Sequence, residues 1–267
     1  MKLFRVLVPV WIAITASSPV LASETLSVAI PSSFQPMLES LKPRLNEQLG
    51  TTVMIQAKGN EGIYQDLNQQ KMTNDVIIFV ENPSLGKNNI NAYLSKNSQV
   101  IAASQVVLWC PNLYLPKRVS VQDSIFQANI KSIALPIKEN RVHQIFIKNI
   151  PKLPASTKLT LTKDSLVAWR MARNQQVQCS ATLDKWLRPT DQFVRVSAEQ
   201  IILRGYINPE LKNPAKAQQM LNLLSSPLIQ PLMMRSTSLE LAQGTAKPKR
   251  ISTTLLTEAP KRNSRTS

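Results

Sequence analysis

Two adjacent serines, Ser32 and Ser33, stand where an apolar strand predicted at residues 26–30 turns into a helix predicted at residues 34–49. The first residues of a helix have backbone N–H groups without partners, and the serine hydroxyls add donors at the same point. Proteins hold oxyanions with such donors and need no charged side chain to do so. The junction therefore predicts an anion site, with helix capping by serine as the alternative.

A second junction of the same kind follows along the chain. A strand predicted at residues 52–57 leads into the turn KGNEG and then into a helix predicted at residues 63–70. In this turn Asn60 has an amide that can donate a hydrogen bond to an anion, whereas the carboxylate of Glu61 would repel one. Because two such junctions in succession indicate parallel strands with crossover helices, both turns are expected at the same edge of a sheet.

The rest of the chain continues this alternation. Residues 74–80 form a continuously apolar run, as expected of a strand buried on both faces. Pro43 is expected to kink the first helix or to end it early. Further strands are predicted at residues 104–110, 132–136, 157–162 and 177–181, and further helices at residues 141–149, 165–174 and 214–224. The pattern predicts an α/β protein with its ligand at the carboxyl ends of the strands.

Residues suited to catalysis or to metal binding are scarce. The chain has one histidine, His143, and no G-x-S-x-G or H-E-x-x-H motif, so no nucleophile with a neighbouring base is evident. We interpret His143 as a packed or solvated residue. No Cys/His cluster has the spacing of metal ligands. We therefore expect no enzyme and no resident cofactor or metal.

The N-terminus and the cysteines point to the same compartment. Residues 1–22 are typical of a cleavable secretory signal, because Lys2 and Arg5 precede an apolar run that is short for a bilayer; an uncleaved anchor is the alternative. The two cysteines, Cys110 and Cys179, would form a disulfide in an oxidising space if their strands are neighbours. Closing so long a loop contributes about 4 kcal/mol in the chain-entropy model. We predict a periplasmic, disulfide-bonded protein.

The net charge of +16 is high for a chain with only 18% charged residues. Part of it lies near the N-terminus and in residues 240–267, where Ser, Thr, Pro and six Lys/Arg predict a flexible basic tail. A core of about +10 remains. Such a core attracts anionic polymers and concentrates small anions. Aromatic residues make up only 5% and do not alternate with the basic ones, so nucleic-acid binding is not expected.

The order of these motifs resembles that of the periplasmic molybdate-binding proteins, the substrate-binding subunits of molybdate ABC transporters. The first junction of that family resembles V-A-I-P-S-S-F here, and its second loop and following strand resemble G-N-E-G and N-D-V-I-I. The strand at residues 105–109 occupies the place where the family crosses from its first lobe to its second. Residues 214–228, which contain L-L-S-S-P, resemble the family's closing helix. The resemblance covers residues 26–239.

The resemblance implies a two-lobed type II periplasmic-binding-protein fold with a parallel or mixed sheet in each lobe and a hinge between the lobes. By this comparison residues 23–103 form the first part of lobe 1, residues 104–190 form lobe 2, and residues 191–239 return to lobe 1. Ser33 matches the family's first ligand serine, with Ser32 beside it. The second ligand serine falls on Asn60 or Glu61.

The second lobe departs from the family pattern. Glu139-Asn140-Arg141-Val142 replaces a Pro-x-Gly turn, and Ala181 stands at the position of a tyrosine. Arg141 is a candidate for a bidentate clamp on an anion, with an exposed surface arginine as the alternative. A changed pocket favours a different anion, a larger organic ligand, or a protein that binds no small molecule.

The function that the resemblance implies is that of an extracytoplasmic solute-binding protein. It would capture a small oxyanion similar to molybdate or tungstate as a monomer and deliver it to the membrane permease of an ABC transporter. The alternative is a degenerate scaffold that binds another organic solute, or a protein or acidic polymer, through its basic surface.

Overall fold

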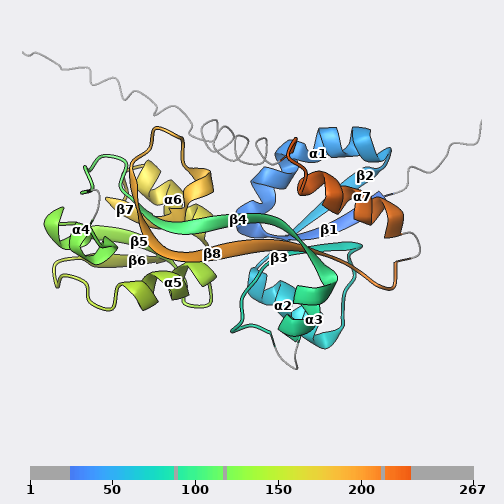
Figure 1. The fold of residues 1–267 in the computed structure, drawn as a ribbon, viewed down its shortest axis with the longest axis horizontal. Coiled ribbons are helices and arrows are strands. Elements are labelled where there is room, and N and C mark those ends of the chain that lie inside the picture. Colours follow the sequence, from blue (N-terminus) through green and yellow to red (C-terminus); the bar gives the residue numbers. More distant parts are fainter. Residues whose placement is uncertain (1–24, 87–89, 117–118, 212–213, 230–267) are drawn as a thin grey trace, which may run out of the picture.

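The computed structural model describes residues 25–86, 90–116, 119–211 and 214–229 (Figure 1). The predicted signal peptide at residues 1–22 and the predicted basic tail at residues 240–267 lie outside these ranges. Within them, no helix is both long enough and apolar enough to cross a membrane.

Eight strands form one mixed sheet in the order β2-β1-β3-β8-β4-β7-β5-β6. Parallel pairs join β1 to β2 and β3, and β5 to β6 and β7, while β8 and β4 pair antiparallel with their neighbours. The strands are β1 (Thr25–Pro31), β2 (Thr52–Lys58), β3 (Val76–Val80), β4 (Ser98–Trp109), β5 (Ser132–Pro136), β6 (Lys158–Thr162), β7 (Cys179–Leu183) and β8 (Phe193–Ile207).

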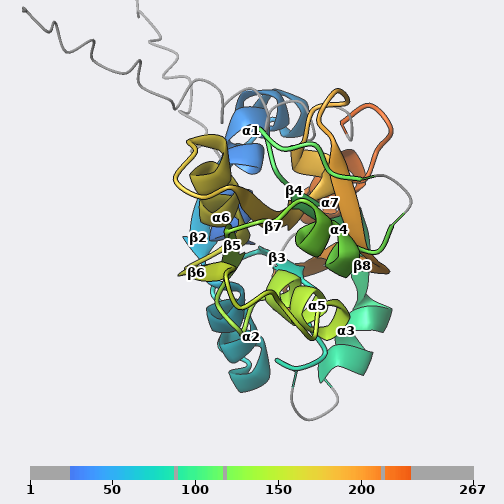
Figure 2. The ribbon, with the colours of Figure 1, turned by 90° about the vertical axis from the view of Figure 1, so that its left-hand side faces the viewer.

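Helices cover both faces of this sheet. Figure 1 shows α1 and α7 on one side of β1 and β3, with α2 and α3 on the other, and Figure 2 shows α5 and α6 on opposite sides of β5. The helices are η1 (Ser32–Phe34), α1 (Gln35–Leu49), α2 (Asn60–Gln69), α3 (Ile90–Asn97), α4 (Val121–Gln127), α5 (Arg141–Asn149), α6 (Ser165–Arg173), η2 (Asp184–Trp186) and α7 (Pro214–Leu224).

Two long strands, β4 and β8, connect two lobes (Figure 1). The first lobe contains β1, β2 and β3 with α1, α2, α3 and α7, and the second contains β5, β6 and β7 with α4, α5, α6 and η2. The ladder between β4 and β8 shifts register twice, between Val100 and Ala102 and between Gln105 and Val107. Because β8 pairs with β3 and β4 pairs with β7, the strands of both lobes belong to one continuous sheet. The sheet expected in each lobe is one side of this continuous sheet: β1, β2 and β3 lie on one side of β8 and β4, and β5, β6 and β7 lie on the other. The residue boundaries predicted for the lobes stay predictions.

Strand β8 and the first half of β4 were not predicted from the sequence. The expected strand at residues 104–110 begins at Ser98, and β8 lies in a segment for which no strand was expected. Exposed and partly exposed positions interrupt the buried ones along β8, so its side chains form no continuous apolar run. Long-range pairing with β3 and β4 fixes this strand.

The first helix passes through Pro43 and ends at Leu49. Of the two expected effects of Pro43, an early end of the helix was wrong, whereas a kink at this residue stays a prediction. Proline removes one backbone hydrogen bond, but Leu41, Leu45 and Leu49 are all buried in the core, and this burial keeps the helix in place. Gly50 ends the helix with a φ of 57°, in the left-handed region that glycine adopts without strain.

The predicted disulfide between Cys110 and Cys179 is confirmed. Cys110 follows β4 directly and Cys179 opens β7, and the register that pairs Trp109 with Ser180 sets the two cysteines opposite each other. Both are buried. The bond fastens the second lobe to the end of a strand that both lobes share.

Candidate functional site

A cavity of about 50 Å³ lies between the two lobes. Its first-lobe wall includes Pro31, Gly59 and Val80, at or just beyond the ends of β1, β2 and β3. Its second-lobe wall includes Lys163 and Leu183, which follow β6 and end β7. The carboxyl ends of strands from both lobes therefore face this space, as expected for the ligand site of an α/β protein.

All five residues predicted to bind a ligand line this one cavity. They are Ser32, Ser33, Asn60, Glu61 and Arg141. The first four come from the two junctions of the first lobe, and Arg141 begins α5 in the second. The fold thus brings the predicted residues together, while their role in binding stays a prediction.

Ser33 offers a donor to the cavity. The residue is 8% exposed and lines the cavity, and its hydroxyl has no hydrogen-bond partner among the described residues. Its oxygen is not one of the fully enclosed polar atoms without a partner, so the hydroxyl is accessible from the cavity and available to a ligand or a water molecule. Ser32 differs, because its hydroxyl lies 3.5 Å from Oδ2 of Asp164 in the second lobe.

The helix starts around the cavity differ between the lobes. In the first lobe, α2 begins after Gly59, which has no side chain to cap it, so N–H groups of its first turn remain as donors. In the second lobe, Asn140 caps α5 by accepting from Val142 N at 3.0 Å, and Asp164 caps α6 by accepting from Val167 N at 2.9 Å. The first lobe therefore presents donors, and the second lobe has a buried acceptor.

The side chain of Asn60 is partly used by the fold. Its Oδ1 accepts from Val80 N at 2.9 Å, and its Nδ2 donates to Val80 O at 3.0 Å, so it extends the end of β3. One hydrogen of the amide is left for another acceptor. The side chain of Glu61 bends back towards Gly59. Its Oε2 lies 3.1 Å from the place that a Cβ atom would occupy if Gly59 had a side chain. A carboxylate thus sits at the start of α2, where the helix dipole favours negative charge.

Arg141 lies at the cavity, but its guanidinium already has partners. Nη2 forms an ion pair with Glu199 of β8, and Nη1 donates to Gln144 at 3.3 Å. Glu199 also lies 3.5 Å from Lys148. Because Glu199 offsets much of its charge, Arg141 is less available as an anion clamp than its position in the sequence indicated.

Asp164, Lys163 and Trp186 also line the cavity, and the sequence analysis missed them. A signal was present: the predicted strand at residues 157–162 passes through Lys163-Asp164 into the predicted helix at residues 165–174, which makes a third strand-turn-helix junction. Aspartate before such a helix is a common N-cap. Trp186 had no comparable local signal, because η2 is a single turn after β7.

A second contact joins the lobes beside the cavity. Asn82, fully buried after β3, donates from Nδ2 to the backbone oxygen of Glu139 in the second lobe at 3.1 Å. Its backbone N–H donates to the hydroxyl of Tyr64 at 3.0 Å. Burial raises the pKa of Tyr64 to about 12, so this phenol stays neutral around pH 7.

Among the described residues, no group of three or more His, Cys, Asp or Glu side chains is placed to hold a metal ion. The chemistry of the cavity is therefore that of its hydroxyls, backbone N–H groups, carboxylates and cations.

Solved structures with a similar fold were found, although no protein-family model and no curated protein match the chain. A periplasmic molybdate-binding protein from Azotobacter vinelandii matches with a TM-score of 0.61 at 14% identity, over 79% of this chain and 97% of that one. A phosphate-bound substrate-binding protein from Clostridium perfringens matches with a TM-score of 0.57 at 9% identity, over 80% and 98%. Iron-bound HitA from Pseudomonas aeruginosa matches with a TM-score of 0.55 at 13% identity, over 79% and 84%.

The chain therefore has the type II periplasmic-binding-protein fold that the sequence analysis predicted. At these identities the likeness concerns the fold alone. The three proteins bear the names of different ligands, so the ligand of this chain has to be argued from its own cavity.

Proposed function

We propose that this protein is an extracytoplasmic solute-binding protein that encloses a small oxyanion between its lobes and delivers it to the permease of an ABC transporter. The observation that carries the proposal is the donor set of the first lobe. The hydroxyl of Ser33, which has no hydrogen-bond partner among the described residues, and the uncapped start of α2 line the same interlobe cavity. Such donors stabilise negative charge without a compensating cation.

The size and position of the cavity agree with this function. A space of about 50 Å³ suits a ligand of a few heavy atoms and is small for a larger organic solute. Because β4 and β8 connect the lobes behind it, bending of these strands would open and close the cavity around the ligand. The predicted secretory signal and the disulfide fit an extracytoplasmic monomer, and the cavity residues supply no evident catalytic pair.

Replacing Ser33 by alanine is expected to weaken oxyanion binding. The variant leaves one ligand oxygen without a donor inside a closed cavity. We expect this to weaken the free energy of binding by about 1 to 3 kcal/mol, which raises the dissociation constant roughly 5- to 150-fold. Titration calorimetry of the purified protein with phosphate, arsenate, sulfate, molybdate and tungstate measures the effect on whichever anion binds.

Ser40→Ala is the matched control for this variant. Ser40 lies on α1, and its hydroxyl donates to Met37 O at 2.7 Å, away from the cavity. Its removal is expected to leave the dissociation constant unchanged. Equal affinities of wild type and Ser33→Ala would contradict a site in this cavity.

One observation favours the second candidate, a scaffold that binds an acidic polymer. Residues 104–190 contain 13 Lys/Arg against 4 Asp/Glu, whereas residues 23–103 contain 6 against 7. The excess charge of the core is thus concentrated in the predicted second lobe.

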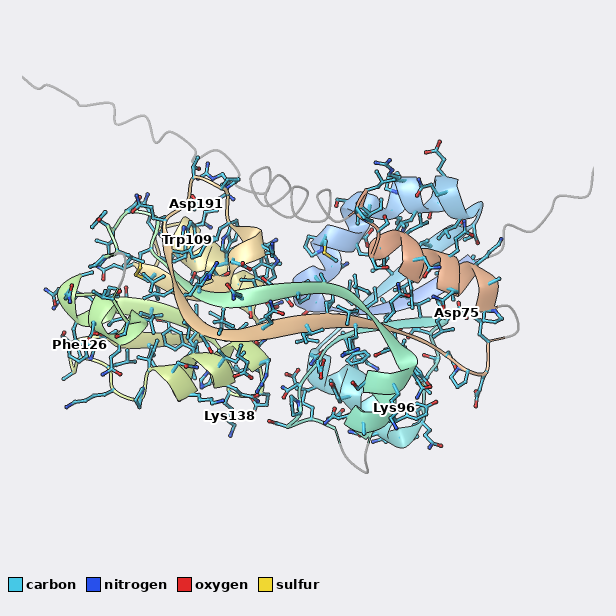
Figure 3. All side chains as sticks on the ribbon, in the orientation of Figure 1. Asp75, Lys96, Trp109, Phe126, Lys138 and Asp191 are labelled. Atoms are coloured by element: carbon cyan, nitrogen blue, oxygen red, sulfur yellow. A yellow bond between two sulfur atoms is a disulfide. The ribbon has the colours of Figure 1, made fainter. Side chains whose placement is uncertain are left out.

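Figure 3 shows Lys138 of that lobe directed away from the fold. Three lysines of this lobe are exposed. Lys131 directly precedes β5 and lies beside Lys158, which begins β6, because Lys158 N donates to Lys131 O at 2.8 Å. Lys152 lies in the segment between α5 and β6.

Charge reversal tests this candidate. The variant Lys131→Glu/Lys152→Glu/Lys158→Glu is expected to weaken binding to immobilised heparin at low salt by about tenfold or more, because electrostatic attraction depends on local charge density. Arg44→Glu/Lys71→Glu/Lys96→Glu changes the net charge equally in the first lobe and serves as the control. Equal losses in both variants would show that only net charge matters and would argue against a specific surface.

A further inference from the structure

We propose that the ligand carries a proton, which it donates to Oδ2 of Asp164, so that the cavity selects protonated oxyanions of the phosphate and arsenate type over sulfate and molybdate. This inference rests on the proposed function and narrows its ligand class. It follows from the placement of a buried acceptor in the second lobe opposite the donors of the first.

Asp164 is held in place and has one oxygen to spare. Its side chain is 8% exposed, and Oδ1 accepts from Val167 N at 2.9 Å, which fixes the orientation of the carboxylate. Oδ2 contacts the Ser32 hydroxyl at 3.5 Å, which is long for a hydrogen bond between two oxygens. Oδ2 therefore has lone pairs free for a stronger donor at the interface of the lobes.

An ionised carboxylate can only accept hydrogen bonds. A ligand that touches Oδ2 must therefore bring a hydrogen of its own. Sulfate and molybdate carry no proton near neutral pH and would meet Asp164 oxygen to oxygen. Phosphate and arsenate carry at least one proton under the same conditions and can donate it, while their other oxygens accept from Ser33 and from the start of α2.

The remaining charges of the cavity support this reading. Glu61 adds a second carboxylate to the lining, and Arg141 is already paired with Glu199. Lys163 is exposed at the cavity wall and is the other cation of the lining. With Arg141 paired, the two carboxylates of the lining, Glu61 and Asp164, outnumber the remaining cation, Lys163, so no excess of positive charge is available to offset the repulsion between Asp164 and a fully deprotonated dianion.

The test compares four anions on the purified wild-type protein at pH 7 and constant ionic strength. Phosphate and arsenate are expected to raise the melting temperature in proportion to the logarithm of their concentration, and sulfate and molybdate are expected to raise it far less. Calorimetry then gives the dissociation constants. We expect the dissociation constant of phosphate to be at least about tenfold lower than that of sulfate. Sulfate cannot donate to Asp164, and the loss of one hydrogen bond to a charged group weakens binding by about this factor.

Asp164→Asn reverses the hydrogen-bonding character of this position. An asparagine caps helices as well as aspartate does, so α6 should still form, and its amide can donate to an unprotonated oxygen. The variant is expected to lose at least about tenfold in phosphate affinity and to gain affinity for sulfate and molybdate. Asp123→Asn removes the same charge on α4, away from the cavity, and is expected to leave the order of the anions unchanged.

The outcomes separate this inference from the proposed function. If sulfate or molybdate binds wild type as tightly as phosphate, and Ser33→Ala weakens that binding, the cavity is an oxyanion site but the role of Asp164 is overturned. If none of the anions binds, both proposals fail. Binding of glycine alone, whose ammonium group can also donate to Asp164, would replace the oxyanion by a zwitterion and would likewise contradict both.

Discussion

Removing the disulfide is expected to lower the free energy of unfolding by about 4 kcal/mol. The bond between Cys110 and Cys179 closes a loop across 69 residues, and constraining so long a loop removes much of the conformational entropy of the unfolded chain. The double variant Cys110→Ala/Cys179→Ala leaves no free thiol to pair incorrectly. Urea unfolding of this variant and of the oxidised wild type measures the difference in the free energy of unfolding. Both curves are fitted with the same m-value, which is the slope of that free energy against urea concentration.

Reduced wild-type protein serves as the control for the substitutions themselves. It lacks the bond but keeps both buried side chains, so its stability should lie close to that of the double variant. Because the bond ties the end of β4 to β7 within the second lobe, anion affinity should change much less than stability once the variant is folded. Unfolding midpoints that coincide in oxidised and reduced protein would show that the bond contributes little.

Replacing Trp186 by alanine is expected to affect both stability and binding. Trp186 is 4% exposed, lines the interlobe cavity, and contacts Phe34 of the first lobe edge to face at a centroid distance of 5.7 Å. Its turn is fixed to β4, because Asp184 accepts from Ser104 Oγ at 2.6 Å and from Gln105 N at 2.9 Å. Truncating a buried aromatic side chain typically costs about 3 to 5 kcal/mol.

The same change enlarges the interlobe cavity and removes an aromatic contact between the lobes. We therefore expect weaker oxyanion binding in addition to the loss of stability, measured by urea unfolding and by calorimetry under conditions where the variant is folded. Trp186→Phe keeps a ring against Phe34 and should recover much of both properties. A Trp186→Ala variant with unchanged anion affinity would show that the aromatic wall does not position the ligand.

The local pattern of the sequence predicted the elements that carry the site. Ser32 and Ser33, and likewise Asn60 and Glu61, lie beside one cavity because each pair follows a parallel strand directly. The helical spacing of Leu41, Leu45 and Leu49 also outweighed the local effect of Pro43. Such features depend on residues a few positions apart, so a sequence can be read for them.

The roles of individual side chains depended on partners far away in the chain. Arg141 is paired with Glu199, 58 residues later, and Ser32 lies beside Asp164, 132 residues later. Asn60 is partly occupied by the backbone of Val80, 20 residues later. None of these contacts leaves a periodic signal in the sequence, because a hydrogen bond or an ion pair needs only two matching groups that the fold brings together.

The sequence by itself determined the α/β class and the edge of the sheet at which a ligand is expected, since strand-turn-helix junctions and apolar spacing are local properties. The pairing of the two cysteines depended on the fold, because it required β4 and β7 to be neighbours. Only the tertiary structure decided that β8 runs beside β4 through both lobes, that Glu199 offsets the charge of Arg141, and that Asp164 faces the donors of the first lobe. These features arise from strand pairing and charge contacts between distant segments, and they exist only once the chain has folded.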